Sequence, residues 1–166
     1  MQNEIRKVVT KGKAAGVLRL VFHDAGTFEL DDHSVSWADM ISVAGSEAVS
    51  ICGGPTIPVV LGRLDSAQPD PEGKLPPETL SASGLKECFK RKGFSTQELV
   101  ALSGAHTIGS KGFGDPTVFD NAYYKILLEK PWTWVKRYAE DQDKFFEDFT
   151  NAYIKLVNSG AKWNML

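Results

Sequence analysis

The sequence is poor in cysteine and in histidine. Its 166 residues include two cysteines, Cys52 and Cys88, and three histidines. Two cysteines form at most one bridge, so the disulfide framework of small secreted proteins is excluded. Each cysteine lies in a helical pattern beside apolar neighbours, which predicts buried free thiols and favours a reducing compartment.

Strong charge and long apolar runs are also absent. The formal net charge is −2 and the pI is about 5.9, which provides neither a basic field for nucleic acid nor a cationic face for membranes. No run approaches the roughly 18 apolar residues of a membrane span. Residues 1–13 have no apolar signal-peptide core, so we expect no targeting segment in this sequence. The composition, 42% hydrophobic and 24% charged, is that of a globular protein.

Apolar spacing predicts a mostly α-helical fold. Ser36 and Ser95 are each followed three residues later by an acidic residue, as at helix N-termini. Gly53 and Gly93 each end a helical pattern. We expect helices over residues 4–12, 13–25, 36–51, 83–92, 95–106 and 115–130, and a last one containing Phe145 to Val157.

A long irregular stretch, about residues 53–80, divides these helices. It contains six prolines and four glycines, and residues 59–61 are its one candidate strand. Connections this long are usually functional, disordered or linkers. Because neither side is a convincing separate domain, we interpret residues 1–166 as one domain, with a first part of about 1–52 and a second of about 81–166.

Three side chains at helical spacing suggest acid–base chemistry. Arg19, Phe22 and His23 lie at i, i+3 and i+4 and therefore share one helix face. Such a histidine can take a proton from one peroxide oxygen and return it to the other. The arginine can stabilise negative charge on the departing oxygen. Spacing alone favours the alternative, a buried or solvated histidine beside a surface arginine.

A second histidine, His106, closes an apolar helical run. Small residues precede it, and they would let a flat ligand approach the backbone. A neutral imidazole facing a planar iron cofactor is one interpretation; a hydrogen-bonded core histidine is the other. We interpret His33, next to Asp31 and Asp32, as solvated.

The two histidine segments together resemble the plant haem peroxidase superfamily. Residues 19–24 (RLVFHD) resemble its distal motif and residues 102–109 (LSGAHTIG) its proximal motif. Secreted members have four disulfides, which two cysteines exclude. The intracellular ascorbate peroxidases are the most similar branch. Within it, the sequence most resembles the ascorbate peroxidase-related proteins, because Phe22 occupies the position where a typical ascorbate peroxidase has tryptophan. Further landmarks follow in family order at residues 36–39, 53–55, 62–65, 119–124 and 138–163.

The resemblance implies a role for each site residue. His106 would bind the iron of haem b, His23 would act as general base and then acid, Arg19 would polarise the O–O bond and Phe22 would wall the pocket. Thr107 and Asp120 would help to bind a structural K⁺ or Ca²⁺. The implied activity is reduction of hydrogen peroxide to water with a small reductant, ascorbate or a phenol, in peroxide detoxification and the oxidative stress response. The implied location is intracellular, in chloroplast or cytosol.

The chain is shorter than the family pattern. It lacks the distal Asn that orients the catalytic histidine. It also lacks the proximal Asp that bonds the iron-bound histidine; the segment that contains this Asp would fall between Thr133 and Trp134. The family's proximal Trp would fall near Gly112, and its ascorbate-contacting Arg has no counterpart. Without that Trp, the second oxidising equivalent would stay on the porphyrin. Two alternatives stay open: a haem-binding protein with little turnover, and a haem-free remnant that acts by binding.

Overall fold

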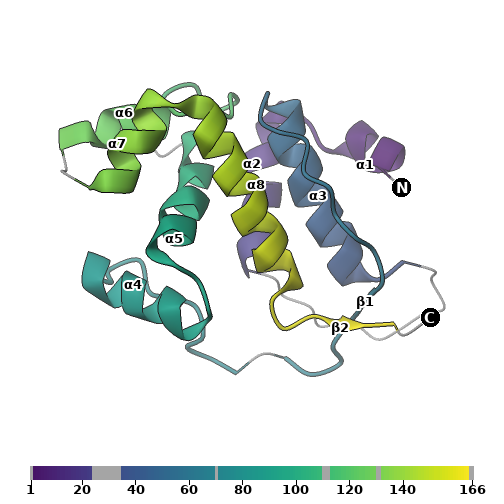
Figure 1. Ribbon diagram of the computed structural model, residues 1–166. Coiled ribbons are helices and arrows are strands. Elements are labelled where there is room, and N and C mark those ends of the chain that lie inside the picture. The colour runs from purple at the N-terminus through teal and green to yellow at the C-terminus, as the bar shows by residue number, and fades with distance from the viewer. Residues whose placement is uncertain (1, 24–34, 70, 110–112, 130–131, 165–166) are drawn as a thin grey trace.

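The computed structural model describes residues 2–23, 35–69, 71–109, 113–129 and 132–164. The described chain is mainly helical, which confirms the predicted class (Figure 1). None of its helices is long and apolar enough to cross a membrane. The helices are α1 (Gln2–Val8), α2 (Lys11–His23), α3 (Trp37–Ile51), α4 (Ala82–Arg91), α5 (Thr96–Ser103), the 3₁₀ helix η1 (Gly104–Thr107), α6 (Ala122–Ile126), the 3₁₀ helix η2 (Leu127–Glu129), α7 (Thr133–Glu140) and α8 (Gln142–Asn158). The strands are β1 (Arg63–Leu64) and β2 (Lys162–Trp163).

Helices α2 and α3 pack closely against each other. Among the described side chains of α2, Ala14, Leu18 and Val21 are buried; they recur at helical spacing and form one apolar face. A Cβ atom added to Gly45 of α3 would collide with the side chains of Val21 and Tyr153. Helices α2, α3 and α8 therefore meet at a position that only glycine can occupy.

The second half of the chain packs around α8, which lies between α5 and α3 in Figure 1. Phe145, Phe149 and Tyr153 are buried along one face of α8. Phe119 contacts the rings of Phe145 and Phe149, with centroids 5.5 and 4.9 Å apart. The Tyr153 hydroxyl donates to the Ser42 carbonyl at 2.6 Å, so this aromatic cluster is tied to α3.

The proline-rich connection begins by folding back along α3. Contacts with the connection move toward the N-terminus of α3 as the chain proceeds: Ser46 Oγ donates to the Ile57 carbonyl, and Asp39 accepts from the Gly62 amide. The connection then forms β1, which pairs antiparallel with β2 near the end of the chain. A two-stranded ribbon therefore closes the fold beside α3.

Several predicted boundaries are wrong. Gly12 lies inside α2 rather than at the end of a helix. The strand is residues 63–64, not 59–61, because pairing with β2 fixes it there. The Asp115 carboxylate accepts from the amide and hydroxyl of Thr117, which makes a local turn, so the next helix begins only at Ala122. Helix α7 was not predicted at all.

Both cysteines are free thiols, as predicted. Cys52 is buried, as predicted, whereas Cys88 is only half-buried. Burial raises the pKa of the Cys52 thiol above its ordinary value.

The N-terminus of α3 is capped both by the adjacent Ser36 and by Asp65 of the proline-rich connection. Ser36 Oγ accepts from the Asp39 amide at 3.0 Å, as its sequence position predicts. The amides of Trp37 and Ala38 donate to the Asp65 carboxylate at 2.9 and 2.8 Å. Three of the four amides that a helix start leaves without partners are thus satisfied.

Replacing Asp65 by alanine is therefore expected to lower the free energy of unfolding by about 1–2 kcal/mol, as for other helix caps. Urea denaturation followed by circular dichroism would measure this. Glu72→Ala, which removes an exposed carboxylate of the same connection, should cost much less. Equal losses in the two variants would contradict the capping role.

Candidate active site

Helix α5 positions His106, and its start is firmly held. Ser95 Oγ accepts from the Glu98 amide at 3.1 Å, and the Glu98 carboxylate accepts from the Ser95 amide at 2.7 Å, which completes the predicted capping box. Lys155 of α8 donates to both Glu98 carboxylate oxygens at 2.8 Å. The helix is thereby fixed to α8 at the end opposite His106.

This cap makes part of the stability dependent on pH. Partial burial raises the pKa of Glu98, but the bonds from Lys155 and Ser95 outweigh it and hold the pKa below its ordinary value of 4.5. The ionised form is thus favoured by folding. Its contribution is complete above the pKa of the unfolded chain and is lost as the pH falls through the lower pKa of the folded chain.

Glu98→Gln is accordingly expected to reduce the drop in thermal unfolding midpoint between about pH 6 and about pH 3. Glu87→Gln, at an exposed position of α4, is the control and should leave the drop unchanged. A Glu98→Gln variant with the same acid sensitivity as the parent would count against this account.

His106 lies in η1, immediately beyond α5. Its side chain is exposed, and its ring centroid is 5.9 Å from that of Tyr123. Gly104 is required for packing, because a Cβ atom there would collide with Phe145 and the Tyr124 hydroxyl. The core thus gives a second reason for a small residue at this position, which the sequence interpretation did not include.

Helix α2 presents an open stripe on the side away from its buried face. Gly12, Gly16, Arg19 and His23 recur at intervals of four, three and four residues and so follow one another along the helix. No described atom lies within 4 Å of a Cβ atom added to Gly12 or Gly16, and Arg19 is exposed. The side chains of Phe22 and His23 lie outside what the structure describes, as does residue His33.

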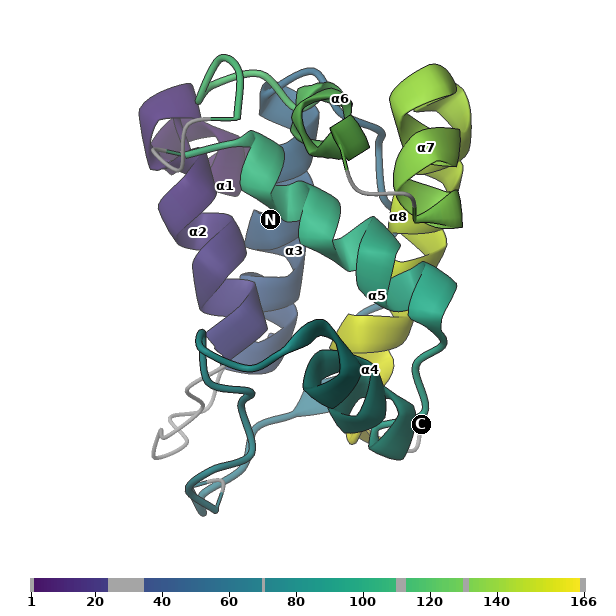
Figure 2. The same cartoon turned by 90° about the vertical axis from the view of Figure 1, so that its left-hand side faces the viewer.

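The two histidine-bearing segments come together at one end. Gly109, three residues after His106, lies against α2, because a Cβ atom added there would be 3.0 Å from the Ala15 Cβ. In Figure 2, α5 runs upward toward the N-terminal half of α2. The segment that carries exposed His106 therefore meets the helix that carries exposed Arg19. These residues fit a ligand held by His106 and approached by the Arg19 face of α2.

The predicted cation ligands are in contact with each other. Thr107 is buried, and its hydroxyl donates to the Asp120 carboxylate at 2.8 Å. The same carboxylate oxygen accepts from the Ala122 amide at 2.9 Å. Among the described residues, no group of three or more His, Cys, Asp or Glu side chains is arranged to hold a metal ion.

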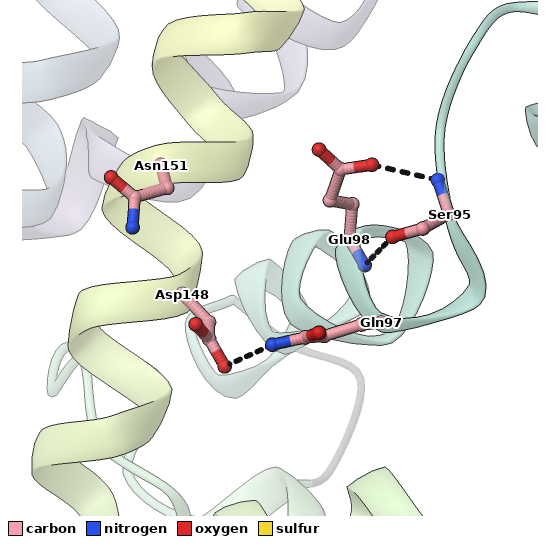
Figure 3. A pocket seen from close by; sticks show the side chains of 5 residues that line it. All are labelled: Ser95, Gln97, Glu98, Asp148 and Asn151. Atoms are coloured by element: carbon pink, nitrogen blue, oxygen red, sulfur yellow. Dashed lines mark hydrogen bonds between the residues drawn. The ribbon is translucent and has the colours of Figure 1, made fainter.

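A polar hollow between α5 and α8 contains none of the predicted site residues (Figure 3). In it, the Gln97 amide donates to the Asp148 carboxylate at 2.8 Å. Its lining is Ser95, Gln97, Glu98, Asp148 and Asn151.

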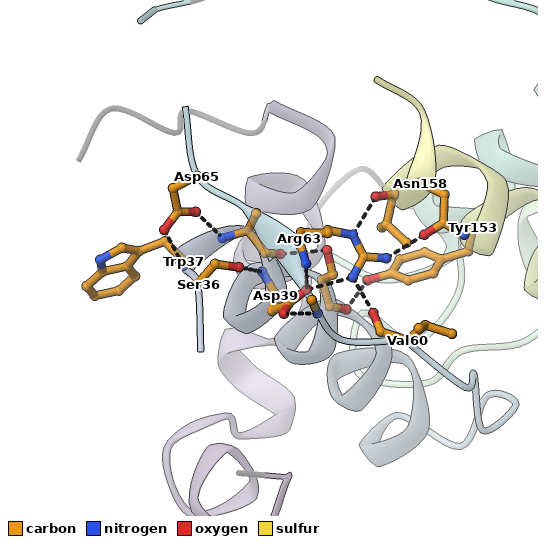
Figure 4. A network of polar contacts seen from close by, with 12 residues as sticks. Ser36, Trp37, Asp39, Val60, Arg63, Asp65, Tyr153 and Asn158 are labelled. Carbon is orange, nitrogen blue, oxygen red and sulfur yellow. Dashed lines mark hydrogen bonds and ion pairs between the residues drawn. The ribbon is translucent and has the colours of Figure 1, made fainter. Parts of the chain in front are cut away.

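Sequence reasoning missed the buried ion pair of Asp39 and Arg63. Both side chains are 3% exposed, and Arg63 Nη1 lies 2.8 Å from Asp39 Oδ1 (Figure 4). The spacing after Ser36 suggests that Asp39 serves the helix cap, but its carboxylate instead accepts from Gly62 and Arg63. The sequence feature that could have indicated this pair is that Asp39 lies on the same helix face as apolar Val43, which predicts a buried carboxylate.

Comparisons with known proteins agree with the two motifs. The family model described as "Peroxidase" matches residues 28–115. The chain is 72% identical, over 229 residues, to "Putative L-ascorbate peroxidase 6" of Arabidopsis thaliana, with 100% of this chain and 70% of that protein covered. It is 33% identical to "L-ascorbate peroxidase 2, cytosolic" of the same plant, with 92% and 87% covered. It is 34% identical to "Cytochrome c peroxidase, mitochondrial" of Yarrowia lipolytica, with 76% and 51% covered.

The first of these alignments also bears on the predicted missing segments. It runs over 229 residues, which is 63 more than the 166 residues of this chain. The relative therefore contains residues, within the aligned region, that this chain lacks. The chain belongs to the peroxidase family and, within it, to the class I haem peroxidases that include the ascorbate peroxidases, of which it is a shortened member.

Proposed function

We propose that this chain, acting as one domain, is a haem b-dependent peroxidase that reduces hydrogen peroxide to water with a small reductant. Its membership of the class I haem peroxidases supports this, and so does the approach of its two motif segments at Gly109 and Ala15. That approach is the observation that carries the proposal, because it brings the segment of His106 to the helix of Arg19.

The chain's own residues divide the work. His106 would hold the haem iron, and the haem when bound supplies the electrons that reduce peroxide. His23 would take the proton from one peroxide oxygen and return it to the other, which leaves as water. Arg19 stabilises the charge on that departing oxygen, and Phe22 walls the pocket.

Names of the relatives support the finer parts of the proposal. Ascorbate is the reductant we favour because two relatives are named for it; a small phenol is the other candidate. We place the chain in the cytosol or chloroplast, as relatives are named cytosolic and chloroplastic, in peroxide detoxification under oxidative stress. For a structural K⁺ or Ca²⁺, the support is the contact of Thr107 with Asp120, which gathers oxygen ligands of the type such ions use.

A haem titration tests the proposal. The purified chain is expected to give a stoichiometric Soret band that changes rapidly when hydrogen peroxide is added. His106→Ala should lose the band because the iron ligand is gone, whereas His33→Ala, the matched control, should retain it. Absence of a stoichiometric band in the parent chain would overturn the proposal.

A second candidate is a haem-binding protein with little turnover. The 63-residue excess in the alignment favours it, because loss of a residue that orients a metal-bound histidine typically costs ~10–100-fold in affinity or activity. A Soret band that does not respond to peroxide would identify this case.

A further inference from the structure

The structure contains an unbroken series of oxidisable aromatic side chains, three tyrosines and a tryptophan, and its first member lies next to His106. Centroid separations along it are 5.9 Å from His106 to Tyr123, 5.1 Å from Tyr123 to Tyr124 and 5.1 Å from Tyr124 to Tyr138. The last member, Trp134, lies 5.9 Å from Tyr138. Tyr124 and Tyr138 are fully buried, whereas Trp134 is half-buried. The series thus leads from the predicted iron ligand through the core to the surface on α7.

We infer that Tyr123, Tyr124, Tyr138 and Trp134 form an electron relay between the haem bound at His106 and a reductant at the surface, with Tyr138 as the residue on which the radical settles. This inference rests on the proposed function, which supplies the oxidant: a haem group from which peroxide has taken two electrons. One electron moves from Tyr138 through Tyr124 and Tyr123 to that group. A one-electron reductant at Trp134 then restores Tyr138.

Hydrogen bonding selects Tyr138. A phenol that loses an electron must also lose its proton, and the Tyr138 hydroxyl donates to the Asp148 carboxylate at 2.9 Å. That carboxylate takes the proton when Tyr138 is oxidised and returns it on reduction. The Tyr124 hydroxyl instead donates to the Val100 carbonyl at 2.7 Å, and a carbonyl cannot hold a proton at neutral pH. An electron can therefore move through Tyr124, but a stable tyrosyl radical cannot form there.

Asp148 is suited to this exchange by its position. Its burial raises its pKa, but hydrogen bonds from Gln97, Lys144 and Tyr138 outweigh burial and hold the pKa below its ordinary value, so the proton acceptor is ionised. Asp148 also lines the polar hollow of Figure 3. Burial, together with Asp148, raises the pKa of Tyr138 far above its ordinary value, so the relay starts from the neutral phenol.

The first test needs no haem. Azide radicals generated by pulse radiolysis oxidise tryptophan in the haem-free chain, and the tryptophan radical absorbance should decay as tyrosyl absorbance grows. Trp134→Phe should abolish this transfer. Trp132→Phe is the matched control: this side chain is exposed, none of the four tyrosines contacts its ring within the described part of the chain, and the transfer should persist.

Two further variants locate the acceptor and its base. Tyr138→Phe should remove the tyrosyl signal, and Asp148→Asn should slow its growth because the proton has no acceptor. Transfer that is unchanged in both Trp134→Phe and Tyr138→Phe overturns the relay, as does the absence of transfer in the parent chain. Circular dichroism of each variant establishes that the fold is retained.

The second test adds haem and hydrogen peroxide and records electron paramagnetic resonance spectra after rapid freezing. A tyrosyl signal that Tyr138→Phe removes supports the relay. Haem that reacts with peroxide but gives no tyrosyl signal overturns the relay and leaves the proposed function standing. Failure to bind haem overturns the proposed function and the haem end of the relay, whereas tryptophan-to-tyrosine transfer in the haem-free chain would still support its surface end.

Discussion

Replacement of Arg63 by alanine is expected to destabilise the fold by about 3–5 kcal/mol, because it leaves the buried Asp39 carboxylate without its charge partner. Arg63 is 4% exposed, and each of its three guanidinium nitrogens donates a hydrogen bond. Besides Asp39, it donates to the Val157 carbonyl at 2.8 Å and to the Asn158 side chain, and it lies 4.8 Å from the centre of the Trp163 ring. One side chain thus ties α3 to the end of α8 and to β2, as Figure 4 shows for α3 and α8.

Urea denaturation of Arg63→Ala, Asp39→Asn and the double variant would measure this contribution. We expect the double variant to be less destabilised than the sum of the single ones, because removing both members leaves no unpaired buried charge. Lys7→Ala is the control, since its partner Glu4 and Lys7 itself are 72% and 68% exposed, and exposed pairs contribute about 0–1 kcal/mol. A loss in Arg63→Ala as small as that in Lys7→Ala would show that the pair is dispensable.

Replacement of His23 by leucine is expected to slow the reaction of the haem-loaded chain with hydrogen peroxide by ~10²–10⁴-fold, the usual contribution of a positioned acid–base group. His23 is the last residue of α2, one helical turn beyond Arg19. Leucine resembles histidine in size but cannot accept the proton. Haem binding should be retained, because the iron ligand would be His106 on another segment.

Stopped-flow absorbance after mixing with peroxide would give the rate, and the Soret band before mixing would give haem occupancy. His33→Leu is the matched control, since the sequence predicts a solvated histidine there, and its rate should equal that of the parent. Unchanged peroxide reactivity in His23→Leu would remove His23 from the mechanism.

Structural features that depend on a few neighbouring residues were predictable from the sequence. Ser95 and Glu98 predict a capping box, and both of its hydrogen bonds are present. Ser36 caps α3 as expected. Such features are decided within one helical turn, so no knowledge of distant segments is needed. The two histidine motifs identified the family for a related reason, as each is a short segment with a distinctive set of chemical groups.

Features that join distant segments were not predictable in the same way. The Asp39–Arg63 pair joins residues 24 positions apart, and the contacts of Arg63 with Val157 and Asn158 join residues more than 90 positions apart. Likewise, Asp115 followed by Pro116 has the form of a helix start, but its carboxylate bonds Thr117 in a turn. The sequence pattern allows both outcomes, and packing against the rest of the chain selects one.

By itself, the sequence determined that the protein is mostly helical, that Ser36 and Ser95 cap helices and which family it belongs to, because these follow from local spacing and from short motifs. Only the tertiary structure decided that Gly104 serves the core, that Asp39 pairs with Arg63 rather than with its own helix start, and that three tyrosines and a tryptophan follow one another from His106 to the surface. The physical reason is that each of these depends on atoms from separate elements, α3 with β1, η1 with α6 and α8, and α6 with α7, whose relative positions no local pattern specifies.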